Sequence, residues 1–331
     1  MKANLHRIIA TAVTFFLMVT GSVFGTNRLS ETPEQYVKYV EGISAFTNTM
    51  ETAQPQTIVY GLIKNHFTSP LPAGKTEKKV LVIGYDGCRA DTLRLMESAE
   101  TSAILDLDDN GGETILTYAG GVNYPFLNTQ ATSTAPGWCS MLTGEWANVH
   151  GIRSNGQRKS NDHLTLLTTL VQDGIVDSSA FYISWPGHFG SYFTTYYPEK
   201  QYVEKNGINA HFVQAEDDAG TVNNILTDLR QKDCTDFIFS TLEHTDHVGH
   251  SSGFGAWNPK YAQAFADAER DGLEILRTLR ARETYEQEDW LVLITTDHGG
   301  YNLNHGRCTI QERYTFLTSN KPISVETAVT P

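Results

Sequence analysis

Short apolar runs recur along the chain and alternate with longer amphipathic stretches. The runs lie at 79–86, 180–185, 236–242, 290–296 and 314–318. Continuous runs rich in Val, Ile and Phe predict strands that are covered on both faces. Helices are expected at 162–172, 217–231 and 259–282. This alternation predicts an α/β fold with a largely parallel central sheet sandwiched between helices.

The chain before residue 76 has a different pattern. Lys2 and Arg7 precede an uncharged stretch at 8–24, which predicts a signal peptide or an N-terminal anchor at 1–25. Residues 26–75 are expected to form a helical region, 33–67, and a loop, and residues 76–331 a single domain. We therefore expect an extracytoplasmic protein, secreted or periplasmic, that contacts a membrane only through its N-terminal segment.

The composition is that of an ordinary globular protein, with 40% hydrophobic and 19% charged residues. The formal charge of −13 argues against a surface that coats nucleic acid, because binding phosphates along a strand needs a basic face. An anionic substrate would have to be attracted by something local. Bound cations held by carboxylates would provide that attraction.

Asp and His concentrate where the apolar runs end. Four of the five runs end in this way, at Asp86-Gly87, Trp185 to His188, Glu243 to His250 and Asp297 to Gly300. Ligands of parallel sheets bind beyond the carboxyl ends of the strands, so these residues are expected to meet. Carboxylate and imidazole together suit Zn²⁺, and two ions about 4 Å apart can hold both the attacking and the leaving oxygen of a phosphoryl transfer. The sequence thus predicts two divalent metal ions, with Zn²⁺ as the expected metal.

The ordered motifs of the chain resemble a known family. They are Asp86-Gly, Thr134-Ala-Pro, Thr143-Gly, His150-Gly-Ile, Trp185-Pro-Gly, Asp246-x-x-Gly-His250, Asp297-His298-Gly and His305-Gly. Together they resemble the alkaline phosphatase superfamily and, within it, the nucleotide pyrophosphatase/phosphodiesterase branch, over residues 79–323. The resemblance implies an alkaline phosphatase-like catalytic domain at 76–331.

The resemblance also implies roles for individual residues. One zinc would be held by Asp246, His250 and His305, and the second by Asp86, Asp297, His298 and the nucleophile Thr134. Asn155 would donate to a non-bridging phosphoryl oxygen. The expected activity is hydrolysis of a small-molecule phosphate ester, a diester rather than a monoester, through a phosphothreonine intermediate.

Contacts to the rest of the substrate are expected from Ala135, Trp185, His188 and Arg153, and Arg89 and Arg153 could pair with phosphate. Ala135 stands where nucleotide-handling members often carry an aromatic residue, so nucleotides are expected to gain little over a simple aryl diester. Three alternatives remain open: a phosphomonoesterase, a phosphonate hydrolase, and a non-catalytic surface or binding protein stabilised by metal. A sulfatase is disfavoured because the Cys/Ser-x-Pro-x-Arg run of that chemistry is missing.

Overall fold

The structure, a computed structural model, describes residues 31–120 and 130–323, so the leader expected at 1–25 lies outside the described residues. The described strands are β1 (Gln54–Pro55), β2 (Glu77–Tyr85), β3 (Glu113–Tyr118), β4 (Ser179–Ile183), β5 (Ala210–Gln214), β6 (Phe237–Leu242), β7 (Glu288–Thr295) and β8 (Tyr314–Ser319). The described α-helices are α2 (Pro33–Ile43), α3 (Ile58–Thr68), α4 (Ala103–Asp109), α5 (Thr134–Thr143), α6 (Ala147–His150), α7 (Leu166–Gln172), α8 (Tyr197–Asn206), α9 (Asp218–Leu229), α10 (His244–Ser252), α11 (Pro259–Arg280) and α12 (Ile310–Arg313). Two 3₁₀ helices lie at Ala90–Leu95 and Tyr285–Gln287.

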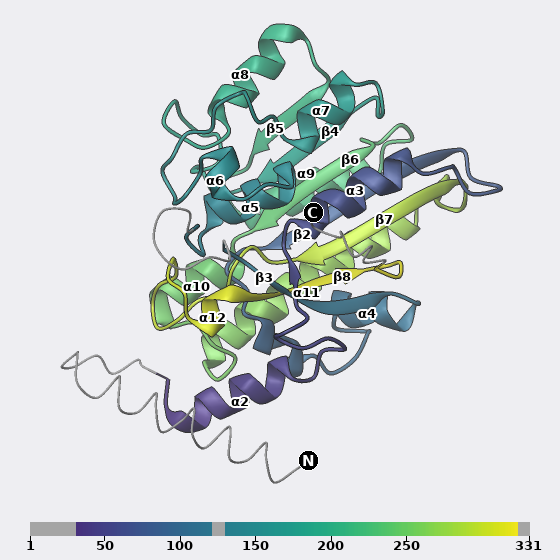
Figure 1. Cartoon of the computed structure of the whole chain (residues 1–331). Coiled ribbons are helices and arrows are strands. Elements are labelled where there is room, and N and C mark those ends of the chain that lie inside the picture. The colour runs from purple at the N-terminus through teal and green to yellow at the C-terminus, as the bar shows by residue number, and fades with distance from the viewer. Residues whose placement is uncertain (1–30, 121–129, 324–331) are drawn as a thin grey trace.

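The strands form one sheet in the order β1-β3-β8-β7-β2-β6-β4-β5 (Figure 1). The neighbours of β2, β4 and β6 are all parallel, as expected. Strand β8 differs, because it runs antiparallel to both β3 and β7. The largely parallel sheet predicted from the sequence is therefore confirmed, with one reversed strand between β3 and β7.

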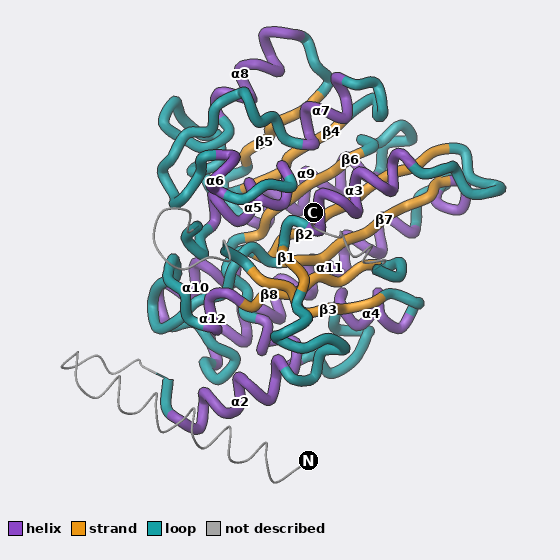
Figure 2. Tube along the Cα trace, in the orientation of Figure 1, coloured by secondary structure: helices purple, strands orange, loops and turns teal. Residues whose placement is uncertain are grey.

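Helices cover both faces of the sheet, and strand β2 explains why. Its apolar side chains alternate between two separate cores. Val80 and Val82 pack with α3, α5 and α7, whereas Leu81 and Ile83 pack with α4, α9 and α11. A strand buried on both faces reads as an uninterrupted apolar run, which is the pattern seen in the sequence. Figure 2 shows the strands as a layer between helices.

The region expected to be helical at 33–67 consists of two helices. Thr32 begins α2 with a capping box that includes Gln35. The intervening residues are rich in Ser, Thr and Asn and contain Pro55, and they form β1, which pairs with β3. Helix α3 then places Val59 and Ile63 in the same core as α5. This N-terminal region is therefore built into the sheet and its core.

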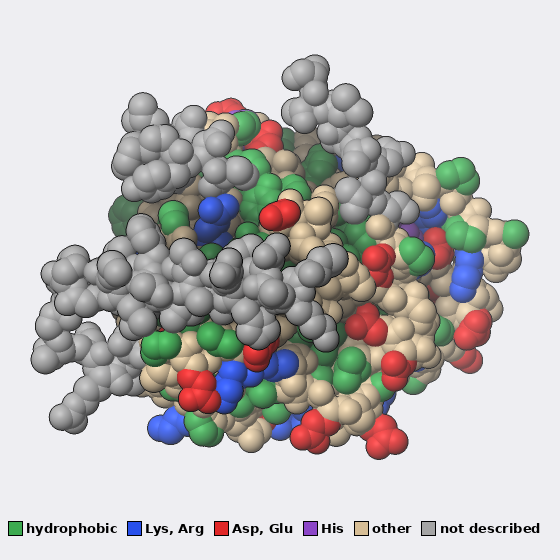
Figure 3. Space-filling model, turned by 60° about the horizontal axis from the view of Figure 1, so that its bottom comes forward, with side chains coloured by type: hydrophobic (Ala, Val, Ile, Leu, Met, Phe, Trp, Pro, Cys, Tyr) green, Lys and Arg blue, Asp and Glu red, His purple; other side chains and the backbone are tan. Residues whose placement is uncertain are grey.

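Charged side chains of both signs are interspersed over the described part of the face in Figure 3. Among the described residues, no helix combines the length and apolar character needed to cross a bilayer.

Candidate metal centre

The two predicted ligand sets meet at the carboxyl ends of three adjacent central strands. In the order β7-β2-β6, Asp86 follows β2, Asp297 follows β7 by two residues, and α10 begins two residues after β6. All three strands are parallel, so their ends point to one edge, the one that carries α10 (Figure 1). The fold thus brings together residues that are more than two hundred positions apart in the chain.

The first set comprises Asp246, His250 and His305, whose donor atoms lie within 4.8 Å of one another. Asp246 and His250 are four residues apart on α10, so they share one helix face. Their nearest atoms, Oδ2 and Nε2, are 3.3 Å apart. His305 joins from the loop after β7, with its Nε2 3.6 Å from Oδ1 of Asp246 and 3.1 Å from Nε2 of His250.

Backbone carbonyls fix the tautomers of the two imidazoles in this set. Nδ1 of His250 lies 2.8 Å from the carbonyl of Leu303, and Nδ1 of His305 lies 3.1 Å from that of Thr132. A carbonyl can only accept, so each Nδ1 carries the proton and each Nε2 presents a lone pair. This carbonyl support is the usual way in which a protein orients a metal-binding histidine.

The second set comprises Asp86, Asp297 and His298, all fully buried. One oxygen of each carboxylate is already bonded: Trp138 Nε1 donates to Oδ2 of Asp86 (2.8 Å) and the Gly87 amide donates to Oδ1 of Asp297 (3.1 Å). The remaining oxygens lie 3.6 Å and 3.3 Å from Nε2 of His298. His298 donates its Nδ1 proton to the Gly299 carbonyl (2.7 Å), so its Nε2 also presents a lone pair.

The arrangement fits divalent cations on the evidence of its own atoms. Oδ1 of Asp246 and Oδ2 of Asp297 are buried and have no hydrogen-bond partner among the residues that the structure describes. Burial, together with the neighbouring carboxylates, raises the pKa of Asp86 well above its usual range. Burial likewise raises the pKa of Asp297, and the charge of Asp246 adds to this. Buried lone pairs and carboxylates that face one another need positive charge between them.

Glu243 is a buried carboxylate of the centre that the sequence analysis did not assign. Its donor atom lies within 4.8 Å of those of Asp86 and Asp246, one from each ligand set. Burial raises the pKa of Glu243, and Asp246 and Asp218 raise it further. The available signal was its position, since Glu243 directly follows β6 in the same run end as Asp246.

Thr134 opens helix α5 beside the second ligand set. Its Oγ1 lies 3.4 Å from Oδ1 of Asp86 and 3.4 Å from Nε2 of His298. Ser133 is the extended N-cap residue, so the helix begins at Thr134, two residues before Pro136. The amide groups of this helix start point to where an anion would sit. Gly137 allows the approach, because a Cβ there would lie 2.8 Å from Cβ of Asp297.

Asn155 lies in an exposed loop and reaches back to the start of α5. Its Oδ1 accepts a hydrogen bond from the Ala135 amide at 2.9 Å. This assigns Oδ1 as the inward atom and leaves Nδ2 as a donor. The Ala135 methyl group is itself fully buried, so this residue offers only its backbone.

The residues predicted to contact the substrate beyond its phosphate are less closely grouped than the metal ligands are. His188 is fully buried against Phe181, Trp185 and Tyr196, and within residues 31–120 and 130–323 neither of its ring nitrogens has a hydrogen-bond partner. Trp185 is half-buried over that ring. Arg153 lies in the Asn155 loop, where its carbonyl accepts from the Ala131 amide.

Arg89 does not serve as a phosphate ligand in this structure. Its guanidinium is fully buried and is bonded to the carboxylates of Asp91 and Glu31. The sequence could not reveal this pairing with Glu31, which lies 58 residues earlier.

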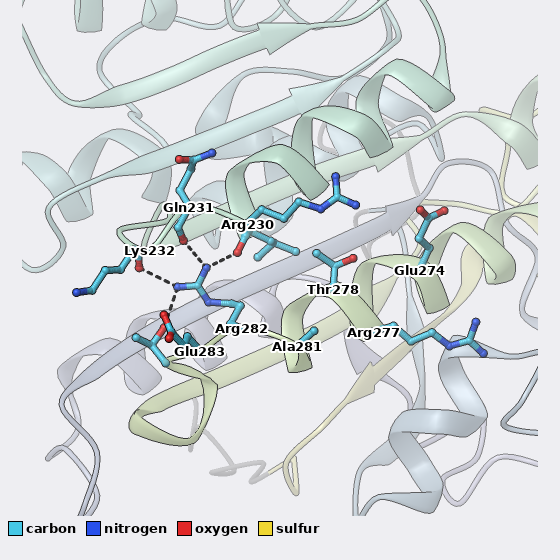
Figure 4. Close-up of a pocket in the computed structure, with 11 residues that line it drawn as sticks. Arg230, Gln231, Lys232, Glu274, Arg277, Thr278, Ala281, Arg282 and Glu283 are labelled. Atoms are coloured by element: carbon cyan, nitrogen blue, oxygen red, sulfur yellow. Dashed lines mark hydrogen bonds between the residues drawn. The ribbon is translucent and has the colours of Figure 1, made fainter.

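A groove of about 440 Å³ lies away from the ligands, between the ends of α9 and α11. Arg282 extends along it and donates to the carbonyls of Leu229, Gln231 and Lys232 (Figure 4). Arg282 also pairs with Glu288, the first residue of β7, whereas Asp297 lies beyond the other end of that strand. Arg282, the most buried cation of this groove, is already bonded to three carbonyls and to Glu288, so we assign the groove a structural role.

Comparison with known proteins gave one family match. The profile of the family described as "Type I phosphodiesterase / nucleotide pyrophosphatase" matches residues 80–316. No curated protein matches the chain.

Among solved structures, murine ectonucleotide pyrophosphatase/phosphodiesterase 5 is 19% identical over 71% of this chain and 59% of its own, with a TM-score of 0.48. The phosphonate monoester hydrolase of Agrobacterium radiobacter is 12% identical over 74% of this chain and 68% of its own, with a TM-score of 0.47. A sulfatase-like protein from Bacteroides thetaiotaomicron is 11% identical over 74% and 64%, also with a TM-score of 0.47. The chain spans about three fifths of the length of the murine protein.

Proposed function

The chain belongs to the type I phosphodiesterase/nucleotide pyrophosphatase family, and from this premise we propose that it is a two-metal hydrolase of phosphodiesters. The observation that carries the proposal is the convergence of Thr134 with two triads of metal-compatible donors. A binding protein would not need a hydroxyl at the meeting point of a carboxylate, an imidazole and a helix start.

The two sets of donors would hold one ion each. Asp246, His250 and His305 would bind the first, and Asp86, Asp297 and His298, with Thr134, the second. Zn²⁺ suits this mixture of imidazole and carboxylate. When bound, such ions lower the pKa of a coordinated hydroxyl or water and neutralise charge on the phosphoryl group.

Thr134 would act as the nucleophile. Its Oγ1 attacks phosphorus in line, a P–O bond forms, and the bond to the leaving alcohol breaks. The alcohol leaves with a proton, and the phosphoryl group stays on Thr134 as a phosphothreonine ester. Water then cleaves this ester, which returns the hydroxyl to Thr134 and releases the phosphomonoester product.

Asn155 and the Ala135 amide would bind a non-bridging oxygen of the phosphoryl group. At present the amide donates to Oδ1 of Asn155. A phosphoryl oxygen would share or take over this donor, while Nδ2 of Asn155 supplies a second one. Donors placed where charge develops stabilise the transition state more than the ground state.

The substrate is proposed to be a small molecule, and the protein to act outside the cytoplasm. The acidic net charge supports a small substrate rather than a nucleic-acid strand. The apolar stretch at 8–24 supports export.

A rate profile of the purified chain with zinc tests this function. The assay compares an aryl phosphodiester with the matching monoester, phosphonate ester and sulfate ester, and the diester should be hydrolysed fastest. A faster monoester or phosphonate reaction would replace the proposal with one of those activities. No turnover of any ester, with both metal sites loaded, would leave a metal-stabilised binding protein.

A further inference from the structure

Arg89 is a buried cation that no step of the proposed reaction uses. It lies three residues after Asp86 and has no exposed surface. Its Nε and Nη2 donate to the two carboxylate oxygens of Asp91 at 2.9 and 3.1 Å. Its Nη1 donates to Oε1 of Glu31 at 2.5 Å, and the guanidinium lies over the Tyr39 ring. Arg89 therefore joins the segment before α2 to the loop that follows the first metal carboxylate.

The Glu31 carboxylate continues this connection towards the second ligand set. Its other oxygen accepts from Nε2 of Gln311 at 2.7 Å. The Gln311 carbonyl packs against Gly299 so closely that a Cβ on Gly299 would lie 2.1 Å from that oxygen and 3.1 Å from Cγ of Arg89. Gly299 is also the residue whose carbonyl fixes the tautomer of His298.

The same guanidinium reaches the first ligand set through Phe254. Nη1 of Arg89 lies 3.4 Å from the Phe254 carbonyl, its second acceptor. The Phe254 ring packs edge to face on His250, with centroids 5.5 Å apart, and lies 6.3 Å from the ring of His305. Arg89 and its partners thus contact the residues that position both ligand sets.

We propose that Glu31 and Arg89 form a buried clamp that positions the metal ligands, so that the segment before α2 contributes to metal binding. Glu31 is a positioning residue here, since it acts through Gln311, Gly299 and Arg89. It lies well outside the residues 80–316 that match the family. This inference rests on the proposed two-metal function.

The clamp can be tested without unfolding the protein. Loss of Glu31 leaves Arg89 with both bonds to Asp91, so the buried cation keeps a counter-charge. Glu31→Gln retains an acceptor for Arg89 and should fall between wild type and Glu31→Ala. If Glu31→Ala fails to fold, Glu31→Gln carries the comparison alone.

The measurement is Co²⁺ binding to the metal-stripped full chain, followed by the visible absorption of the ion, at a temperature where circular dichroism shows each variant folded. We expect Glu31→Ala to bind Co²⁺ at least tenfold more weakly than wild type. Glu288→Ala is the matched control. It breaks the buried pair with Arg282, the arginine labelled in Figure 4, roughly 25 Å from the ligands by strand rise.

The control separates a positioning role from a stabilising one. Glu288→Ala should lower the urea midpoint and leave Co²⁺ affinity unchanged, whereas Glu31→Ala should change the affinity and the absorption spectrum. Equal Co²⁺ affinity in wild type and Glu31→Ala would overturn the clamp alone. A wild-type chain that binds no Co²⁺ would overturn the two-metal function, and the clamp with it.

Discussion

The Nε2 atoms of His250 and His305 face each other at 3.1 Å, and each ring donates its Nδ1 proton to a backbone carbonyl. Two lone pairs in this position repel unless a proton or a metal cation lies between them. The rings cannot relieve the repulsion by exchanging tautomers without leaving a carbonyl unpaired. The pair is therefore arranged for a bound cation.

Removing either of these two imidazole rings should lower the number of metal ions bound per chain. We expect wild-type protein to contain two ions per chain, and His250→Ala or His305→Ala to contain about one, because the second ligand set stays complete. Native mass spectrometry gives the count directly. His247→Ala, an exposed change on the same helix, is the control and should retain both ions. Full metal content in both ligand variants would contradict the assignment.

Thr134→Ala should lower turnover of an aryl diester by at least about 10³-fold, because the attacking oxygen is lost. The metal content of this variant should change little, since six other donors remain. Thr134→Ser keeps the oxygen and should retain part of the activity. Mass spectrometry after rapid acid quench should find a phosphorylated peptide containing Thr134. Near wild-type turnover in Thr134→Ala would mean that water attacks directly.

Asn155→Ala should lower kcat by roughly 10²-fold, the usual effect of removing one donor to developing negative charge. Asn155 does not belong to either ligand set, so metal content and thermal stability should stay close to wild type. Asn161→Ala removes another exposed amide, whose Nδ2 donates to the Pro198 carbonyl, and should leave kcat unchanged. A rise in KM with unchanged kcat would mean that Asn155 only binds substrate.

His188→Phe should stabilise the protein in acid. Burial lowers the pKa of His188 from 6.5 to about 3. Between these values the unfolded chain binds a proton that the folded chain does not, so wild type loses stability as pH falls from 6.5 towards 3. At pH 5 this costs about 2 kcal/mol, which the Phe variant avoids.

Urea unfolding of both proteins at pH 7 and pH 5 measures this difference, and contributions shared by the two proteins cancel. An identical pH dependence would show that His188 is protonated or hydrated in the folded state. The diester assay adds a second readout. The Phe variant should keep its turnover, and a loss of turnover in the folded variant would support the substrate contact expected from the sequence.

The sequence predicted the central part of the sheet and not its margins. Strands β2, β6 and β7 are apolar on both faces and therefore stand out as runs. Strand β5 escaped prediction because it is an edge strand with mixed burial, and β3 was not predicted either. The reversal of β8 also had no local signal, since an antiparallel strand in a buried position reads like its parallel neighbours.

The candidate site also has features that the sequence predicted and features that it did not. The positions of the six predicted ligands follow from ordered motifs at strand ends, and the structure brings them together. The partners of Arg89 could not be predicted, because Glu31 meets it only through the packing of α2. The inward position of Glu243 and the tautomers of the histidines also depend on contacts between segments that are distant in the chain.

The sheet order around the centre also sets the time at which metal can be acquired. Asp86 and Asp297 come from adjacent strands, yet 210 residues separate Gly87 from the Asp297 carboxylate that it binds. Such distant pairings form late, because a long loop must close before they contribute any stability. A growing chain cannot assemble the second ligand set until synthesis has passed His298. Metal capture would therefore be a closing event of folding, and the stabilisation that it brings would go only to chains synthesised past His298.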